Sequence, residues 1–227
     1  MTRLRSASLG AFALVLPASL AQGADVSAPP VPTLATFASG VYLHAGPGNI
    51  LLDEATKIKA RGFPVRGANI AVPSQTSLLL ESGYFFTPNV AVSFTGGIPP
   101  LAKFYGTGTV GLLGKLGSAV YGPTALTAHY HFTGLGALQP YIGGGAVYMI
   151  VFKTNDGALT QAQLNNAWGA VVQVGADYMI TNHWGAFFDV KKAYLRTSAT
   201  GFLRTAPIQA KVKMDPLVVH TGITYRF

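Results

Sequence analysis

The sequence predicts an all-β protein, an eight-stranded antiparallel β-barrel that spans a membrane. Charged residues make up 11% and hydrophobic residues 49% of the 227 residues. Beyond the N-terminal segment, however, no run of about 20 apolar residues could form a transmembrane helix. Hydrophobic residues instead occupy alternate positions of several segments, as in strands with one face toward lipid. Short and long connections alternate between these segments, which also favours a barrel.

The first 21 residues have the pattern of a secretory signal peptide. Two arginines precede a short apolar run, Ala7 to Leu16, and residues 19–21 (SLA) form a small-x-small cleavage site. A cut after Gly23 is the alternative. We therefore expect residues 1–21 to be removed and residues 22–227 to form a single outer-membrane barrel domain.

The alternation of apolar and other residues is clearest in two segments. Residues 168–180 place Trp168 and Tyr178 near opposite ends of one apolar face, which is the aromatic girdle arrangement of a lipid-facing strand. The last 11 residues repeat the pattern, with His220 and Arg226 on the other face. Similar alternation predicts eight strands: Ala38–Gly46, Thr76–Phe86, Asn89–Gly97, Ala119–Phe132, Pro140–Phe152, Trp168–Ile180, Trp184–Thr197 and Leu217–Phe227.

The connections between these strands alternate in length. The short connections are 87–89, 133–139 and 181–183, and the long ones are 47–75, 99–118, 153–166 and 198–207. Outer-membrane barrels have short periplasmic turns and long external loops, so both ends of the barrel chain are expected in the periplasm. Within the third long connection, Leu159 to Asn165 are expected to form a short helix.

Several segments resemble the OmpW/AlkL family of outer-membrane proteins. They are YFFTPN (84–89), PTALTAHYHF (123–132), PYIGGG (140–145), WGAVVQVGADY (168–178) and MDPLVVHTGITYRF (214–227). In order and spacing these segments cover nearly the whole mature chain. The terminal Tyr225 and Phe227 also resemble the C-terminal aromatic signature that the outer-membrane assembly machinery recognises.

The resemblance implies a multi-pass barrel in the cell outer membrane of a Gram-negative bacterium. It further implies that a narrow, largely hydrophobic interior passes small apolar molecules by passive diffusion, with sideways release into the bilayer. The first long connection, 47–75, and the pair Lys191-Lys192 depart from the family pattern. The identity of the solute therefore stays open.

Strand parity assigns two sets of side chains to the barrel interior. A polar network, in which Lys191 and Arg226 can pair with the carboxylates, is expected from Glu81, His129, His131, Asp177, Asp189 and Arg226. A path for an apolar solute is expected along Tyr42, Leu79, Thr95, Tyr141, Val147, Met149, Val171, Phe187 and Lys191. The alternative for the apolar members of this path is that they simply fill the barrel, whose interior is too narrow for an aqueous pore.

Two prolines lie toward the outer ends of predicted strands. Because proline lacks an N–H group, Pro123 and Pro216 could border a lateral opening between strands. Their commoner role is to end or bulge a strand.

Three other classes of protein are weighed against transport. A structural or partner-binding barrel with a plugged lumen, resembling an adhesin or receptor, is the main alternative, because fold alone does not establish transport. A barrel-embedded lipid A hydrolase is disfavoured because no Ser–His pairing motif appears, and an enzyme is not expected. A soluble lipocalin-like barrel would carry its polar face outside. His129 and His131 are too few for a metal site, so neither a metal nor a cofactor is expected.

The charge balance suggests a partner for the outer surface. Without the signal peptide, 14 basic residues face 8 acidic ones, and no nucleic-acid-binding motif accompanies the excess. Two of the long connections and their flanks carry basic clusters, which predict contact with outer-membrane lipid and lipopolysaccharide: Lys57, Lys59, Arg61, Arg66, Arg196, Arg204, Lys211 and Lys213. A closed barrel leaves no sheet edge to pair, so a monomer is expected.

Overall fold

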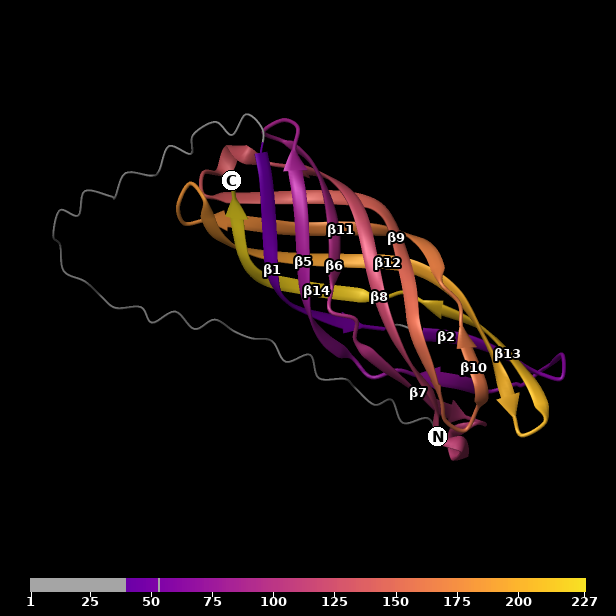
Figure 1. The fold of residues 1–227 in the computed structure, drawn as a ribbon. Coiled ribbons are helices and arrows are strands. Elements are labelled where there is room, and N and C mark those ends of the chain that lie inside the picture. Colours follow the sequence, from indigo (N-terminus) through magenta and orange to yellow (C-terminus); the bar gives the residue numbers. More distant parts are fainter. Residues whose placement is uncertain (1–39, 53) are drawn as a thin grey trace, which may run out of the picture. The chain divides into compact units, whose positions relative to one another are not determined.

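Eight antiparallel strands close into a barrel in the computed structural model, which describes residues 40–52 and 54–227 (Figure 1). The expected signal peptide, 1–21, and the first two residues of the expected first strand lie outside the described residues. The barrel strands are β1 (Gly40–Leu51), β5 (Gln75–Phe85), β6 (Val90–Gly97), β8 (Lys115–His131), β9 (Leu138–Asp156), β11 (Ala167–Met179), β12 (Trp184–Leu203) and β14 (Leu217–Arg226). Each pairs with the next along the chain, and β14 pairs with both β12 and β1, so the predicted fold class is confirmed.

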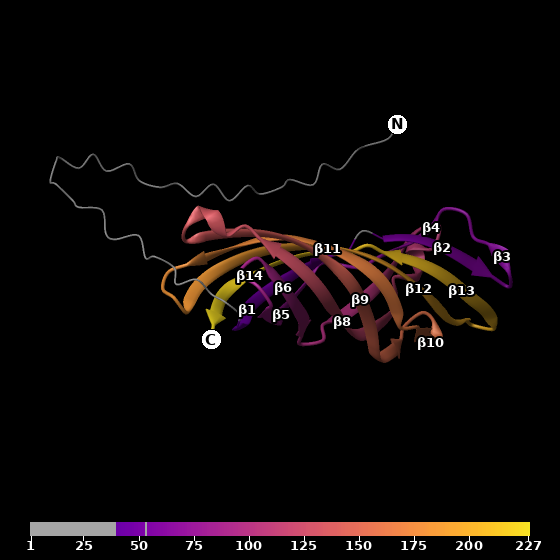
Figure 2. The same cartoon turned by 90° about the horizontal axis from the view of Figure 1, so that it is seen from above.

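Six shorter strands extend the barrel at one end. They are β2 (Glu54–Ala60), β3 (Phe63–Pro64), β4 (Ala68–Ala71), β7 (Leu101–Gly108), β10 (Thr160–Leu164) and β13 (Ala206–Met214). Figures 1 and 2 show β2 beside β13, and the two pair antiparallel. The long connections are therefore largely paired strands that continue the barrel wall.

The short helix expected at Leu159 to Asn165 is wrong. Residues Thr160–Leu164 form β10, whose partner is β12, with Leu164 opposite Ala199. A neighbouring strand supplies the cross-strand partners of this segment, so it does not need a helix to satisfy its backbone. The described 3₁₀ turns lie elsewhere, at Gly111–Leu113 and Thr133–Leu135. No helix among the described residues is long and apolar enough to cross a membrane.

The opposite end of the barrel carries short turns and the last residue of the chain. In two of these turns a threonine hydroxyl accepts a backbone N–H, from Val90 to Thr87 at 3.0 Å and from Trp184 to Thr181 at 2.9 Å. The Phe227 N–H donates to the Val41 carbonyl at 3.0 Å, which places the C-terminus at this end. By the rule that outer-membrane barrels turn tightly on the periplasmic side, we call this the inner end and the extended one the outer end.

Two aromatic girdles border the outward face of the barrel. At the inner end, ring contacts join Tyr84, Phe86, Tyr130, Phe132, Trp184, Tyr225 and Phe227 in three groups. At the outer end, the rings of Tyr148 and Trp168 lie 4.3 Å apart and Tyr194 is exposed on β12. Between the girdles the outward positions carry exposed apolar side chains such as Val172 and Val174. This band is the surface that a bilayer covers.

Candidate functional site: the barrel lumen

An ammonium group held between two carboxylates lies inside the lumen. Lys191 Nζ lies 2.8 Å from Glu81 Oε2 and 2.6 Å from Asp189 Oδ1, and all three side chains are at most 5% exposed. Lys191 and Asp189 are two residues apart in β12 and so share its inward face, whereas Glu81 comes from β5. Charges buried this deeply are tolerated only when they are paired and hydrogen-bonded.

A second ion pair lies in the same part of the lumen. Arg226 Nη2 contacts Asp177 Oδ2 at 2.7 Å, and His44 Nε2 lies 3.1 Å from Asp177 Oδ1. The Arg226 guanidinium also lies 5.0 Å from the centre of the Phe85 ring. This pair joins β14 to β11 across the inside of the barrel.

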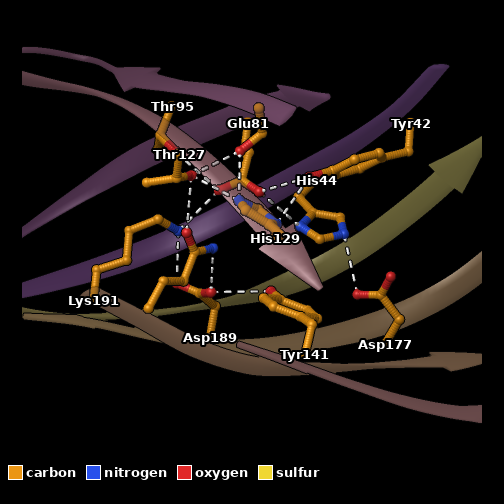
Figure 3. A network of polar contacts seen from close by, with 12 residues as sticks. Tyr42, His44, Glu81, Thr95, Thr127, His129, Tyr141, Asp177, Asp189 and Lys191 are labelled. Atoms are coloured by element: carbon orange, nitrogen blue, oxygen red, sulfur yellow. Dashed lines mark hydrogen bonds and ion pairs between the residues drawn. The ribbon is translucent and has the colours of Figure 1, made fainter. Parts of the chain in front are cut away.

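Hydroxyl and amide groups donate hydrogen bonds to Glu81 and Asp189, the two carboxylates that hold Lys191 (Figure 3). Glu81 accepts hydrogen bonds from Thr95 Oγ1 at 2.8 Å and from the Tyr42 hydroxyl at 3.1 Å. Asp189 accepts from the Tyr141 hydroxyl at 2.9 Å and from Gln173 Nε2 at 2.6 Å. We call these residues, together with the two ion pairs, the lumen network: Tyr42, His44, Glu81, Thr95, Tyr141, Gln173, Asp177, Asp189, Lys191 and Arg226.

Aromatic rings fill the space around the lumen network. His44 stacks on Phe187 with ring centres 4.2 Å apart and planes 7° apart. The two tyrosine rings lie against glycines: a Cβ atom on Gly83 would come within 2.2 Å of the Tyr42 ring, and one on Gly175 within 2.5 Å of the Tyr141 ring. With rings packed against the backbone on two sides, the inner half of the lumen is filled.

The outer half of the lumen is apolar. Met149, Val147 and Val171 are at most 3% exposed and belong to one cluster with residues of the outer extension. A cavity of about 60 Å³ continues from this cluster. Its lining is almost wholly apolar and includes Ile70, Phe104, Leu164, Val212 and Met214.

The residues expected to form the solute path fall into two separate groups in the structure. All of these residues are buried inside the barrel, but Tyr42, Thr95, Tyr141 and Lys191 belong to the lumen network. Val147, Met149 and Val171 belong to the apolar cluster, so the two groups do not form one continuous apolar path. Leu79 packs beside Gly48 and Gly97, and Phe187 stacks on His44. Parity assigns a face but not a depth along the barrel axis, so it does not separate these two groups.

The polar members of the expected network lie where parity placed them. Glu81, Asp177, Asp189 and Arg226 form the ion pairs described above. His129 and His131 are buried in the same zone, with ring centres 5.9 Å apart, and His131 contacts the Phe85 ring.

None of the eight predicted strands includes a residue that lines the outer cavity. Val212 and Met214 lie in β13, where Ile208, Ala210, Val212 and Met214 alternate with polar residues. That alternation is the signal that could have found them.

A serine and a histidine lie in contact in the lumen, although the sequence shows no Ser–His pairing motif. Ser93 Oγ lies 2.9 Å from His129 Nε2, but the same nitrogen lies 2.6 Å from Thr127 Oγ1. The other ring nitrogen faces the Tyr42 hydroxyl at 3.5 Å instead of a carboxylate. Ser93 and His129 are at most 3% exposed in the lumen, far from the lipid-facing surface where a lipid A hydrolase would need them. This geometry lacks the orienting carboxylate and the access of a hydrolytic triad.

The strand ladder is interrupted on one side of Pro123. The pairing of β6 with β8 ends at Thr95 opposite Ala125, and that of β7 with β8 begins at Leu101 opposite Val120. Between these ladders, residues 122–124 pair with β9 alone. We call this interruption the β6–β8 gap.

Proline chemistry explains the β6–β8 gap. The N–H groups of Tyr121 and His131 both point to the β6–β7 side, donating to Pro100 and Asn89. Residues an even number apart in a regular strand direct their N–H groups to the same neighbour, so Pro123 lacks the donor that would face the gap. Pro99 and Pro100, on the opposite edge, also lack donors. Pro216 has a different setting, since its carbonyl accepts from the Ala193 N–H at 3.0 Å and keeps the chain joined to β12.

A closed eight-stranded barrel with two aromatic girdles, an apolar outward band between them and buried ion pairs in its lumen defines a small outer-membrane β-barrel protein. The model of the OmpW family matches residues 38–227. The chain therefore belongs to the OmpW family.

Known proteins of this family agree in sequence and fold. Outer membrane protein AlkL of Ectopseudomonas oleovorans is 31% identical over 175 residues, which are 77% of this chain and 76% of that protein. The dibenzothiophene metabolism operon protein PahQ of Pseudomonas aeruginosa is 32% identical over 196 residues, 86% of this chain and 92% of that protein. The crystal structure of OprG from Pseudomonas aeruginosa superposes with a TM-score of 0.79 at 26% identity, covering 84% of this chain and 96% of that chain.

Proposed function

We propose that this barrel carries small apolar molecules through the outer leaflet of the outer membrane by passive diffusion and releases them sideways into the bilayer. The observation that carries the proposal is the division of the lumen. An apolar outer zone with a cavity lies above an inner zone filled by the lumen network. An apolar solute gains from leaving water for the outer zone but has no apolar contacts to follow through the inner one.

The names of two relatives support the solute class. PahQ and DoxH are each named as a dibenzothiophene metabolism operon protein. Dibenzothiophene is a fused aromatic compound without charged groups. A solute of that class matches the apolar lining of the outer cavity.

The lumen network makes a straight exit to the periplasm costly. Lys191 and Arg226 are each held by carboxylates at 2.8 Å or less. Passage through this zone would separate buried ion pairs, and breaking such a pair costs about 3–5 kcal/mol. A solute in the outer zone meets a lower barrier at the side of the barrel.

The β6–β8 gap supplies that side exit. Pro123 and Met149 face each other in register on β8 and β9, so the gap lies beside the apolar cluster. On the lipid side, a shallow apolar groove lined by Leu78, Phe94, Ile98 and Pro99 lies along the β5–β6 edge of the gap. Leaving through the gap therefore moves a solute from one apolar surface to another.

The test is uptake of n-octane by lipopolysaccharide-containing vesicles that carry wild-type or variant protein. Ala125→Trp places a large ring in the lumen beside the gap, because Ala125 is buried and belongs to the apolar cluster. Ala128→Trp, three residues further along β8, places the same ring on the exposed face. We expect Ala125→Trp to reduce protein-dependent uptake several-fold and Ala128→Trp to leave it unchanged.

Equal uptake by the two variants and the wild type would contradict the proposal. The remaining candidate would then be a partner-binding barrel whose filled lumen has only a structural role. Folding of each variant is checked by its heat-dependent shift in gel mobility.

A further inference from the structure

Five basic side chains lie on the outward face of the sheet formed by β12, β13 and β2 at the outer end of the barrel. We call this surface the basic face, and its residues are Arg196, Lys213, Lys211, Lys57 and Lys59. Alternate positions of the same strands, including Leu195, Ala210 and Ile58, are buried. The strand period therefore directs all five charges outward.

Strand register gathers these charges into adjacent rows. Lys213 lies opposite Arg196 on one side, and Lys211 lies opposite Lys57 on the other. Lys59 lies two residues beyond Lys57, opposite Gln209. Directly opposed residues of antiparallel strands have Cβ atoms about 4.5–5.5 Å apart, so Lys57 and Lys211 form a like-charge pair that opposes folding.

Few acidic groups offset this charge in the described part of the chain. Lys213 Nζ pairs with Asp215 Oδ2 at 2.7 Å. Asp215 is 4% exposed, whereas the lysine side chain is 49% exposed. An anion bound from outside would offset the repulsion that remains.

The position of the basic face relative to the girdle indicates which anion that is. Arg196 follows Tyr194 of the outer girdle by two residues on the same face of β12. Two residues of strand advance about 6.6 Å, so the charges begin just outside the hydrocarbon region. The phosphate groups of a glycolipid outer leaflet lie at that level beside the barrel wall.

We propose that the basic face binds the phosphate groups of lipopolysaccharide in the surrounding outer leaflet. Lysine ammonium groups act as point charges for phosphate, and Arg196 can make a forked, two-bond contact. Because these side chains face outward from the barrel wall, they can contact the phosphates of neighbouring lipid directly, and no binding pocket is needed. This site is separate from the lumen and does not depend on solute passage.

The test compares lipopolysaccharide binding by the full-length protein purified in a zwitterionic detergent. The variant Lys57→Glu/Lys211→Glu reverses the opposed pair. The matched control Lys115→Glu/Lys153→Glu makes the same change of net charge at exposed lysines on β8 and β9. We expect the first variant to bind phosphorylated lipopolysaccharide at least tenfold more weakly than wild type, and the control to bind within about twofold of it.

Two ligand arms identify the phosphate and its source. The first ligand is chemically dephosphorylated lipopolysaccharide, which should bind the wild type at least tenfold more weakly than the phosphorylated form does. The second is inorganic phosphate, which at equimolar concentration should not displace lipopolysaccharide from the wild type. Equal binding of the two glycolipids, equal loss in the control variant, or displacement by inorganic phosphate would each overturn the proposal. Gel-mobility shifts of both variants establish that the barrel is folded in every comparison.

Discussion

Lys191 Nζ lies between Glu81 Oε2 at 2.8 Å and Asp189 Oδ1 at 2.6 Å. This contact joins β5 to β12, which are not neighbours in the barrel wall. The lumen network therefore links strands on different sides of the barrel and also fills the inner part of the lumen. Its removal should affect both stability and the route of a solute.

Replacing Lys191 with Met should destabilise the barrel strongly, because Glu81 and Asp189 would keep buried carboxylates without their cation. We expect a loss of about 3–5 kcal/mol in the free energy of unfolding. The measurement is urea unfolding in lipid vesicles, followed by the fluorescence of Trp168 and Trp184. The triple variant Glu81→Gln/Asp189→Asn/Lys191→Met should lose less, since it leaves no unpaired charge. A larger loss in the triple variant would show that unpaired charge is not the cause.

Tyr141→Phe tests the hydrogen bonds that join the rings to the charged cluster. The Tyr141 hydroxyl donates to Asp189 at 2.9 Å within the lumen. Its removal should cost about 1–2 kcal/mol of unfolding free energy in the same assay. Tyr130→Phe is the control, because Tyr130 is 47% exposed on the outward face. Equal effects of the two changes would argue against a special role for the lumen bond.

Pro123→Ala should slow the release of an apolar solute without unfolding the barrel. The alanine restores an N–H group directed toward the β6–β8 gap, so the ladder can close there. We expect protein-dependent octane uptake to fall several-fold. Pro140→Ala on β9 is the control, because Pro140 already lies in a paired stretch, opposite Ala176. Unchanged uptake in Pro123→Ala would remove the gap from the proposed route.

Tyr225 and Phe227 were interpreted as an assembly signal, and their surroundings allow that role to be separated from stability. Phe227 is 68% exposed and its ring contacts Tyr225 on the outward surface. Phe227→Ala should therefore refold in detergent like the wild type but reach the outer membrane in lower amounts in cells. The measurements are refolding yield in vitro and the amount of heat-shiftable protein in outer-membrane fractions. Normal amounts in cells would argue against recognition of this residue.

Strand alternation made the barrel and its faces predictable from the sequence. In β11 and β14 the outward positions, including Trp168 and Ile223, are exposed as their period-two pattern indicated. The resemblance to known outer-membrane proteins supplied the proposed solute class, which alternation alone does not specify.

The outer extension and the internal contacts were less predictable. Segments such as Thr160–Leu164 are short and mixed in polarity, and they become strands because a neighbouring strand supplies their partners. The contact between Lys191 and Glu81 joins residues 110 positions apart, so it depends on barrel closure. Spacing within one strand cannot give the depth at which two such side chains meet.

The most direct test compares the uptake of n-octane with that of arabinose in one preparation of lipopolysaccharide-containing vesicles, with and without the wild-type protein. An apolar conduit above a polar plug predicts that the protein raises octane uptake several-fold and leaves arabinose uptake at its background rate. Faster arabinose uptake, or octane uptake that the protein does not change, would contradict this account.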